Sequence, residues 1–501
     1  MRSEALARVR AFEKEHWLAP DDPRLPLYHL TGGIGWINDP NGFSLYKGEI
    51  HLFFQYHPYA TYWGPMHWGH VKTRDLIRWE RLPAALAPDQ DYDHAGCFSG
   101  SAVALDDGRH MLMYTGVRKD PMPDGSFREF QTQCLAFGDG LNYEKYAGNP
   151  VIDAALLPPG GDTHDFRDPK LWRADGRFYA VMGNRCPDGC GAVLLYGSDD
   201  GLRWHLEGEL AASHGHRGRM WECPDFFRLD GTDVLIVSPQ EVQADEPEFI
   251  EGNTTLCLLG RFDREQKRFD WTREQTLDYG LDFYAPQTLL LPDGRRVLIA
   301  WMQYWDSADW CPDDLPFYGQ MTLPRELQIR DGRVFQQPVR ELEAYRGAKT
   351  EVRGLALRDE TRSLDGVRGR CLDLTLTIRP ETAGALRAFL LHVASDGDYD
   401  TVIRYDPARG MLLVDRSRAG FPDRVRCVRA FEAGAADGTL RLRVLLDRWS
   451  LELFADDGEH AASFTLYAPQ TADGIRFEAE GAALLDVENY DLEFDNHGET
   501  L

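Results

Sequence analysis

The chain of 501 residues lacks the features of a secreted or membrane protein. Residues 1–20 carry charges throughout and contain no apolar segment of the signal-peptide kind. No uncharged apolar run approaches the roughly 18 residues that a membrane helix needs. The nine cysteines are an odd number without the spacing of a disulfide framework. These absences predict a cytoplasmic protein with free thiols.

Positive charge is also scarce. Lys and Arg total 55 against 81 Asp and Glu, so the formal net charge is −26. Such a surface repels phosphate backbones and anionic lipid, which disfavours nucleic acid and membrane partners but not a neutral sugar. With 501 residues, 43% of the chain hydrophobic and 12% aromatic, there is enough material for two domains.

Clustered metal ligands are few. Cys186 and Cys190 flank a turn, CPDGC, but no second ligand pair stands near them in the sequence, which favours an ordinary surface loop over a metal site. The carboxylates are also too few for a calcium loop. We therefore expect no metal and no cofactor.

One pattern recurs five times: a short apolar run, a tight turn with glycine, and a second apolar run. The turn glycines lie 60, 68, 55 and 63 residues apart and are Gly48, Gly108, Gly176, Gly231 and Gly294. Four of the five turns read Asp-Gly, the dipeptide that supplies the positive φ of a primed hairpin turn. The spacing suits a four-stranded propeller blade with its loops.

The repeats predict an all-β protein, a five-bladed β-propeller over residues 28–335, with an open sandwich of many strands as the alternative. Residues 1–27 are expected to form a helical extension, and residues 336–350 a linker helix. Over residues 351–501 apolar and polar residues alternate, as in half-buried antiparallel strands, for example in CLDLTLTI and SLELFA. This segment predicts a C-terminal β-sandwich.

Acidic residues occupy equivalent places in three repeats. Asp39 and Glu222 each precede their turn glycine by nine residues, and Asp168 precedes its own by eight. Any one of them alone is more simply a turn cap, because Asp often bonds its own backbone. Three at matching positions favour convergence at the central channel, where burial and like charge raise pKa values and leave carboxyl groups in opposite protonation states. Glycoside hydrolysis needs two such groups.

The motifs around these acids resemble those of glycoside hydrolase family 32, the β-fructofuranosidases. They run in the family's order: WINDPNG from Trp36, FSGSA from Phe98, FRDP from Phe166, ECPD from Glu222, FYAPQ from Phe283 and MTLPREL from Met321. The resemblance extends into the C-terminal segment through LLDRWSLELFADDG. It implies a five-bladed propeller followed by a β-sandwich, the fold also indicated by the repeats.

The resemblance implies that Asp39 is the nucleophile, Glu222 the general acid/base and Asp168 the transition-state stabiliser. A retaining mechanism would place the carboxyl groups of Asp39 and Glu222 about 5 Å apart. The expected substrate-binding residues are Asn38, Gln55, Trp63, Phe98, Ser99, Arg167 and Trp301. Cys223 is expected to pack beside Glu222 and not to act as a thiolate.

The expected substrate is sucrose, sucrose 6-phosphate or a short fructo-oligosaccharide, acted on by a monomer or homo-oligomer. A fructan hydrolase, a fructosyltransferase and a non-catalytic sugar-binding propeller remain alternatives. The loop SHGHRGRM, residues 213–220, could bind a phosphate on the leaving group, although a solvated basic loop is the simpler interpretation. The sequence does not decide among the substrates.

Overall fold

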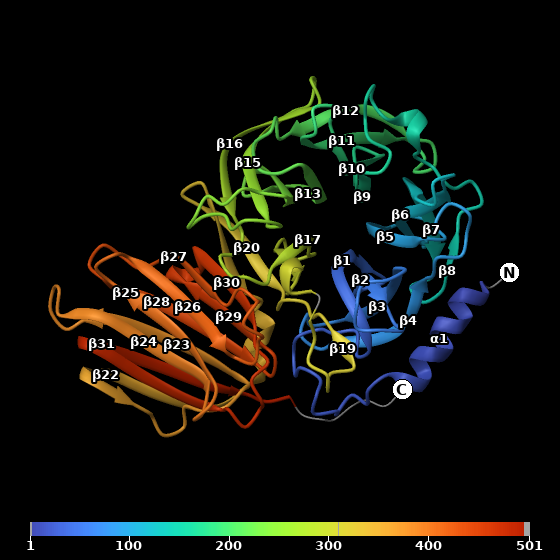
Figure 1. Ribbon diagram of the computed structural model, residues 1–501. Helices are drawn as coiled ribbons and strands as arrows, with labels where there is room; N and C mark the ends of the chain where they lie inside the picture. Colours follow the sequence, from blue (N-terminus) through green and yellow to red (C-terminus); the bar gives the residue numbers. More distant parts are fainter. Residues whose placement is uncertain (1–2, 309, 495–501) are drawn as a thin grey trace.

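The computed structural model describes residues 3–308 and 310–494 as a ring of five β-sheets and a C-terminal sheet domain (Figure 1). Within these residues the single α-helix is α1 (Glu4–His16), which packs against the outer strand of the first sheet. Ser3 caps it by accepting a hydrogen bond from the Leu6 amide. No helix there is both long enough and apolar enough to cross a membrane.

Each blade of the ring contains four antiparallel strands, and the first sheet has one further short strand. Blade 1 consists of β1 (Gly35–Tyr46), β2 (Glu49–His57), β3 (His67–Thr73) and β4 (Glu80–Leu86). Blade 2 consists of β5 (Gly96–Ala104), β6 (His110–Pro121), β7 (Phe127–Gly138) and β8 (Tyr143–Lys145). Blade 3 consists of β9 (Phe166–Ala174), β10 (Arg177–Arg185), β11 (Gly191–Ser198) and β12 (His205–Ala212).

Blade 4 consists of β13 (Met220–Leu229), β14 (Thr232–Gln240), β15 (Leu256–Asp263) and β16 (Arg268–Thr276). Blade 5 consists of β17 (Tyr284–Leu290), β18 (Arg296–Trp301), β20 (Arg325–Arg330) and β21 (Arg333–Pro338). The short strand β19 (Phe317–Tyr318) leaves blade 5 and pairs in parallel with β1. Short 3-10 helices occupy η1 (Ala154–Leu156) and η2 (Trp305–Ser307).

The first strand of every blade is the innermost. Each of these five strands contacts the next one around the ring, and β17 contacts β1, so the ring is closed. Apolar side chains fill the space between neighbouring blades; Phe53 and Trp68 of blade 1, for example, pack with Leu112 and Tyr114 of blade 2. The predicted five-bladed propeller is confirmed, and the alternative open sandwich is excluded.

The five predicted hairpins form, but not all with primed turns. Residues 47–48, 175–176 and 230–231 have positive φ at both central positions, as a primed turn requires. In the turns ending at Gly108 and Gly294 only the glycine has positive φ, and the loop is longer, with Leu105 and Leu291 each bonded to the residue after the glycine. An Asp-Gly pair is compatible with both turn types, so the dipeptide alone did not distinguish them.

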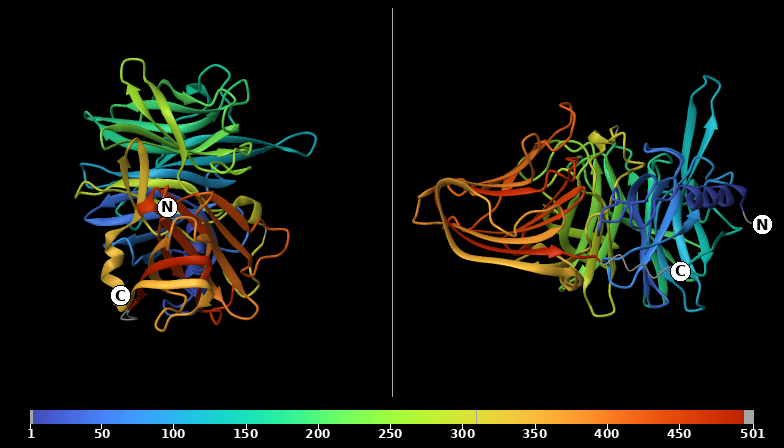
Figure 2. Two further views of the ribbon diagram at one scale, coloured as in Figure 1. Left: turned by 90° about the vertical axis from the view of Figure 1, so that its left-hand side faces the viewer. Right: turned by 90° about the horizontal axis from the view of Figure 1, so that it is seen from below.

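The C-terminal domain is built from ten strands that form one hydrogen-bonded sheet arranged in two layers (Figure 2). The strands are β22 (Arg346–Arg362), β23 (Leu372–Pro380), β24 (Leu386–Ser395), β25 (Asp400–Asp406), β26 (Met411–Arg418), β27 (Val428–Glu432), β28 (Leu440–Asp447), β29 (Ser450–Ala455), β30 (His460–Thr465) and β31 (Gly474–Leu492). The long strand β31 pairs with β24 in its first half and with β23 in its second half, and so links the layers. One apolar core lies between them, as the alternating sequence predicts.

The segment 336–350 is less helical than the sequence indicates. Strand β21 continues to Pro338, the 3-10 helix η3 (Arg340–Tyr345) forms a short connection, and β22 begins at Arg346. Another short 3-10 helix, η4 (Asp456–Gly458), follows β29. Edge pairing of the chain with β20 on one side and β31 on the other takes up residues that were expected to be helical.

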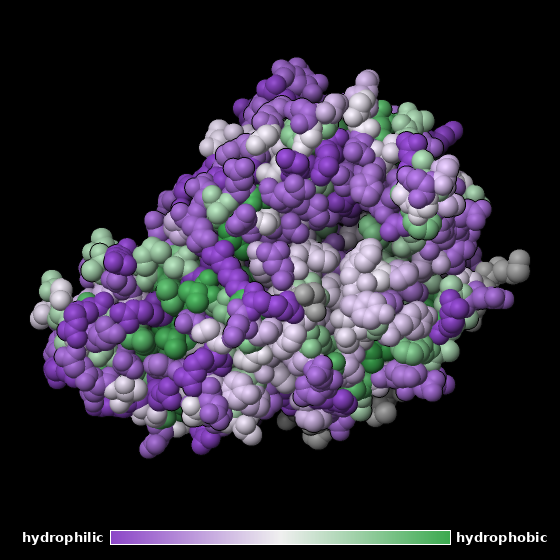
Figure 3. All heavy atoms as spheres, in the orientation of Figure 1, coloured by the Kyte–Doolittle hydropathy of each residue, from purple (hydrophilic) through white to green (hydrophobic). Residues whose placement is uncertain are grey.

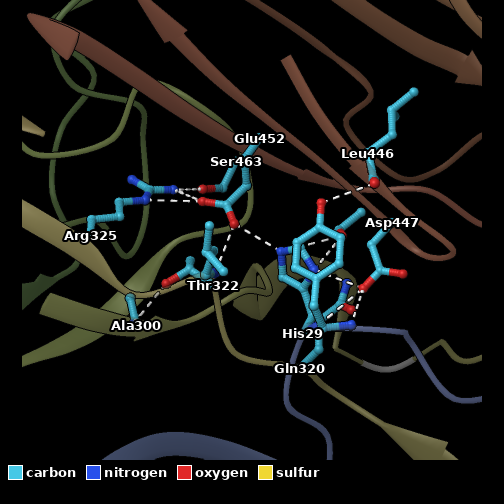
Figure 4. A network of polar contacts seen from close by, with 12 residues as sticks. His29, Ala300, Gln320, Thr322, Arg325, Leu446, Asp447, Glu452 and Ser463 are labelled. Carbon is cyan, nitrogen blue, oxygen red and sulfur yellow. Dashed lines mark hydrogen bonds and ion pairs between the residues drawn. The ribbon is translucent and has the colours of Figure 1, made fainter. Parts of the chain in front are cut away.

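A buried charge network joins the two domains (Figure 4). The Glu452 carboxylate accepts hydrogen bonds from the backbone N–H of Leu323 and from the guanidinium of Arg325, and it lies 2.8 Å from His29 Nε2. His29 Nδ1 lies 3.0 Å from Asp447 Oδ2. Burial lowers the pKa of His29, but the two carboxylates outweigh burial and raise it to about 9.

We expect Glu452→Gln to destabilise the protein by about 3–5 kcal/mol, because it removes the carboxylate that Arg325 and His29 share and leaves two buried cations with less negative charge beside them. Burial raises the pKa of Glu452, but Arg325 and His29 together lower it to about 2. The difference from wild type is therefore fully present above pH 4.5 and disappears as the pH falls towards 2. Urea unfolding at several pH values measures it. The exposed Glu351→Gln, which breaks solvent-screened surface pairs with Lys349 and Arg353, should cost far less stability, and an equal loss in both variants would contradict the argument.

Candidate active site

The innermost strands carry β-bulges that turn side chains into the central channel. The pairing register shifts between Ile37 and Pro40 in β1 and between Glu222 and Asp225 in β13, and β9 and β17 have shifts at the corresponding places. Asp168, Cys223 and Ala285 have positive φ at these bulges. A bulge redirects a side chain without ending the strand, so one backbone feature repeated around the ring brings side chains from different blades together.

These side chains line a pocket of about 440 Å³ at the channel. A hollow marks the centre of the ring in Figure 3. Nine of the ten residues predicted for the site line this pocket: Asn38, Asp39, Gln55, Trp63, Phe98, Ser99, Arg167, Asp168 and Glu222. They come from blades 1 to 4, so the structure brings together residues that are up to 184 positions apart.

Asp39 is held by neighbours on both carboxyl oxygens. Its Oδ2 accepts a 2.7 Å hydrogen bond from Ser99 Oγ, and its Oδ1 accepts one of 3.1 Å from Asn38 Nδ2. The Asn38 amide is itself fixed by a 2.7 Å bond from Trp36 Nε1 to its Oδ1. The indole therefore sets the amide orientation, and the amide and hydroxyl set the orientation of the carboxylate. Hydrogen bonds that are already formed cost no reorganisation when a reaction begins.

Glu222 lies between a cation and a phenol. Arg167 Nε donates to its Oε1 at 2.9 Å, and Tyr284 OH donates to its Oε2 at 2.6 Å. Burial raises the pKa of Glu222 and the nearby Asp39 raises it further, whereas Arg167 and Tyr284 act in the opposite direction; the net pKa is raised. Glu222 is thus a carboxyl group that retains its proton to higher pH than usual and whose ionised form has donors in place.

Asp168 is the most deeply buried of the three acids, with 5% of its surface exposed. Its Oδ2 accepts hydrogen bonds from the Cys223 backbone N–H at 2.9 Å and from the Cys223 thiol at 3.5 Å. Burial raises the pKa of Asp168, and the charges of Glu222 and Asp39 add to the rise. The same thiol lies 3.5 Å from Asp39 Oδ2. Burial and the three acids raise the pKa of Cys223, so its thiol is a neutral donor and not a nucleophile.

Arg167 supplies positive charge to this acidic cluster. Its guanidinium also donates to Asp165 Oδ1 at 2.7 Å and to Gln131 Oε1 at 3.2 Å. Burial alone would lower the pKa of Arg167, but Glu222, Asp168 and Asp165 raise it, so the side chain stays charged. A fixed charge with five donors suits the orientation of carboxylates and sugar hydroxyls alike.

Trp301 was predicted to bind substrate, and this prediction is wrong. Its side chain is fully buried and packs between Trp36 and Trp305 behind the pocket. Trp305, four residues later in η2, lines the pocket instead. The strand β18 ends at Trp301, so an inward-facing residue there enters the core, whereas the following loop reaches the rim.

The pocket contains further residues that the sequence motifs did not identify. They lie on outer strands or loops of blades 2 to 4 or in the loop that follows β18: Glu129, Gln131, His164, Asp165, Arg185, Gln240 and Trp305. Tyr284 stands within the motif FYAPQ but was not assigned a role. Its contact with Glu222 depends on the packing of blade 5 beside blade 4, and no local pattern in the sequence encodes that contact.

The basic loop at residues 213–219 does not line this pocket. Arg217 donates to Glu274 and Asp245, and His216 Nε2 lies 3.0 Å from Glu274 Oε1. Arg219 lies 3.6 Å from Glu241. Carboxylates thus neutralise most of its positive charge, and the structure supports the simpler interpretation of this loop.

Comparison with known proteins agrees with the fold and the motifs. Residues 29–338 match the N-terminal domain model of glycosyl hydrolases family 32, and residues 341–493 match the C-terminal model. The chain belongs to glycosyl hydrolase family 32. This confirms the resemblance seen in the sequence and makes the protein a hydrolase of the β-fructofuranosidase class.

Relatives match along nearly the whole chain. A raffinose invertase of Escherichia coli is 37% identical over 92% of this chain and 93% of its own length. A sucrose-6-phosphate hydrolase of Zymomonas mobilis is 35% identical over 92% and 90%. The structure of a family 32 β-fructofuranosidase of Bombyx mori superimposes with a TM-score of 0.81 at 34% identity, covering 97% of both chains.

Proposed function

We propose that the protein is a retaining β-fructofuranosidase that hydrolyses the fructosyl bond of sucrose, with Asp39 as nucleophile, Glu222 as general acid/base and Asp168 as transition-state stabiliser. The observation that supports these roles is the different environment of each acid in one pocket. Asp39 has hydrogen-bond donors on both oxygens, Glu222 has a raised pKa with donors ready for its ionised form, and Asp168 is buried against a backbone amide.

In the first step Asp39 attacks the anomeric carbon of the fructosyl unit, and the bond to the leaving oxygen breaks as Glu222 gives that oxygen its proton. A covalent fructosyl ester on Asp39 results. In the second step ionised Glu222 takes a proton from water, the water oxygen attacks the anomeric carbon, and Asp39 is released. Retention of configuration follows from the two displacements, and this mechanism is expected to place the two carboxyl groups about 5 Å apart.

The alternation of Glu222 between acid and base depends on its neighbours. Burial favours the protonated form that the first step needs. Once the proton has left, Arg167 and Tyr284 stabilise the carboxylate that the second step needs. A group held between these opposing influences can act as an acid in the first step and as a base in the second.

The remaining pocket residues fit a furanose ring. Asn38, Gln55, Ser99 and Arg167 offer polar groups, while Trp63 and Phe98 meet edge to face with ring centroids 5.9 Å apart and offer an apolar wall. Asp168 is placed to accept hydroxyl hydrogens as positive charge develops on the ring. We assign the catalytic unit to the propeller, residues 28–335, and propose that the C-terminal domain supports ring closure.

The charge of the pocket favours a neutral leaving group. Five carboxylates line the pocket: Asp39, Glu129, Asp165, Asp168 and Glu222. Against them stand Arg167 and Arg185, and Arg185 is already paired with Asp165 at 3.1 Å. A phosphate dianion would enter this field at an electrostatic cost. The relatives include both a sucrose-6-phosphate hydrolase and a raffinose invertase, so similarity alone does not choose between a phosphorylated and a neutral substrate.

A cytoplasmic location is part of the proposal. It is supported by the nine cysteines, all of which are free thiols in the structure, because free thiols persist in a reducing compartment.

We predict that Asp39→Ala lowers kcat by at least about 10³-fold, because no other group can form the fructosyl ester. A slow fructosyl donor with a good leaving group should label Asp39 in the wild-type protein, and mass spectrometry of peptic peptides locates the label. The surface variant Asp106→Ala should behave as wild type. A label on another residue would overturn the assignment of the nucleophile.

We predict that Tyr284→Phe moves the alkaline limb of the pH profile of kcat/KM upwards by about one pH unit. The phenol stabilises the ionised form of Glu222, and a hydrogen bond to a charged group contributes about 1.5 kcal/mol. Without it the pKa of Glu222 rises, so the acid keeps its proton to higher pH. Tyr304→Phe, whose hydroxyl bonds the Glu251 carbonyl, is the matched control. An unchanged limb would remove Glu222 from the role of general acid.

We predict that sucrose has a kcat/KM at least tenfold above that of sucrose 6-phosphate, or about 1.4 kcal/mol in transition-state binding. Fructose release from sucrose, sucrose 6-phosphate and inulin, followed side by side, measures the preference. In Arg185→Gln the ratio of the first two should stay above ten. A selective loss on the phosphorylated sugar would instead identify Arg185 as a phosphate ligand, and a dominant trisaccharide product at high sucrose would indicate a transferase.

A further inference from the structure

The turn between β10 and β11 gathers soft and hard metal ligands at one point. One ligand atom each from Cys186, Asp188 and Cys190 lies within 4.8 Å of the other two. We propose that these three side chains form a structural site for a zinc ion. The sequence favoured a plain surface loop because no second ligand pair follows, but in space the turn supplies three ligands by itself.

The backbone of the turn fixes the three positions. Cys186 N–H donates to the Cys190 carbonyl at 2.8 Å, and Gly189 N–H donates to the Cys186 carbonyl at 2.9 Å. Cys190 N–H donates to Asp188 Oδ1 at 3.1 Å, so the carboxylate is folded back over the turn towards the thiols. In a tetrahedral zinc site with Zn–S near 2.3 Å, ligand atoms lie roughly 3.5–3.8 Å apart. The present separations of at most 4.8 Å exceed that distance by about 1 Å or less.

A second carboxylate lies close to the turn. Glu209 Oε2 lies 3.9 Å from Cys186 Sγ, which adds a second carboxylate to the group. Among the residues that the structure describes, no lysine or arginine forms an ion pair with Asp188 or Glu209. Binding of Zn²⁺ would displace one proton from each thiol, change no oxidation state and leave the net charge of the three ligands plus metal at that of the free carboxylate. Two thiolates with one carboxylate suit zinc better than calcium or magnesium, which prefer oxygen alone.

The fourth position faces a surface cavity. Asp188 and Cys190 line this cavity of about 500 Å³ together with His214 and His216. His216 is engaged by Glu274, whereas no hydrogen-bond partner of His214 is found in the part of the chain that the structure describes. We assign the fourth position to His214 or to water.

The site would stiffen one side of the pocket rim. Arg185 directly precedes Cys186, lines the pocket and pairs with Asp165, whereas neither cysteine lines the pocket. A metal ion in the turn would therefore hold the end of β10 without touching substrate. Its role is structural, and its presence does not depend on which sugar the enzyme cleaves.

The test is metal content together with a spectroscopic probe. The protein is purified under reducing conditions with zinc and then passed over chelating resin. It should contain about one zinc per chain by inductively coupled plasma mass spectrometry. Cys186→Ser and Cys190→Ser should lose the metal, while Cys311→Ser, in a part-buried cysteine elsewhere, should keep it. Cobalt(II) added to the metal-free protein should give a thiolate-to-metal charge-transfer band that both serine variants lack, and Asp188→Asn should bind cobalt at least tenfold more weakly.

Circular dichroism of each variant verifies that the propeller is intact, so loss of metal can be separated from loss of fold. Wild-type protein without zinc and without a charge-transfer band would overturn the proposal. So would zinc retained by the Cys186→Ser variant, which would place the metal elsewhere. A mass two hydrogens below that of the reduced protein, with both cysteines protected from alkylation, would show a disulfide in place of the metal site.

Discussion

The closed ring of blades depends on the buried carboxylate of Glu452. It contacts His29, which precedes blade 1, and both Leu323 and Arg325, which lead into β20 of blade 5, although Glu452 itself belongs to the C-terminal domain. A charge without partners in such a place would cost several kcal/mol. Glu452 therefore has all of its partners only when the first blade, the last blade and the C-terminal domain are assembled. The C-terminal domain is in this sense part of the closure of the propeller. The loop that carries Trp305 to the pocket lies between β18 and β20 of blade 5.

Closure matters for the pocket because the three acids come from three blades. Asp39 belongs to blade 1, Asp168 to blade 3 and Glu222 to blade 4. Each lies at a bulge of an innermost strand, and the bulge sets the direction of its side chain. The packing of the blades around the ring sets the distances between the three side chains. The thiol of Cys223, which contacts both Asp39 and Asp168, shows how closely the ring brings the blades together.

The sequence predicted the features that repeat along the chain and missed those that depend on tertiary packing. The spacing of the turn glycines and the equal offset of Asp39 and Glu222 are local facts, and they were enough to predict five blades and converging acids. Trp301 was misjudged because a strand pattern does not say whether an inward residue reaches the pocket or the core behind it. Tyr284 was missed because it meets Glu222 only through the packing of blade 5 beside blade 4, and Arg185 was missed because it lies at the end of β10, outside the motifs. The turn types differed because Asp-Gly fits more than one hairpin loop.

The electrostatics of the pocket explain why Arg167 cannot be separated from the acids around it. Burial and mutual repulsion oppose the simultaneous ionisation of three carboxyl groups in one pocket. A buried guanidinium bonded to Glu222 and Asp165 offsets that repulsion without titrating itself. Its bond goes to Glu222 and not to Asp39, whose oxygens are held by the neutral donors Ser99 and Asn38. The cation thus lies beside Glu222, which must change its protonation state, and neutral donors lie beside Asp39, which must attack. This arrangement allows proton transfer and nucleophilic attack in one pocket of about 440 Å³.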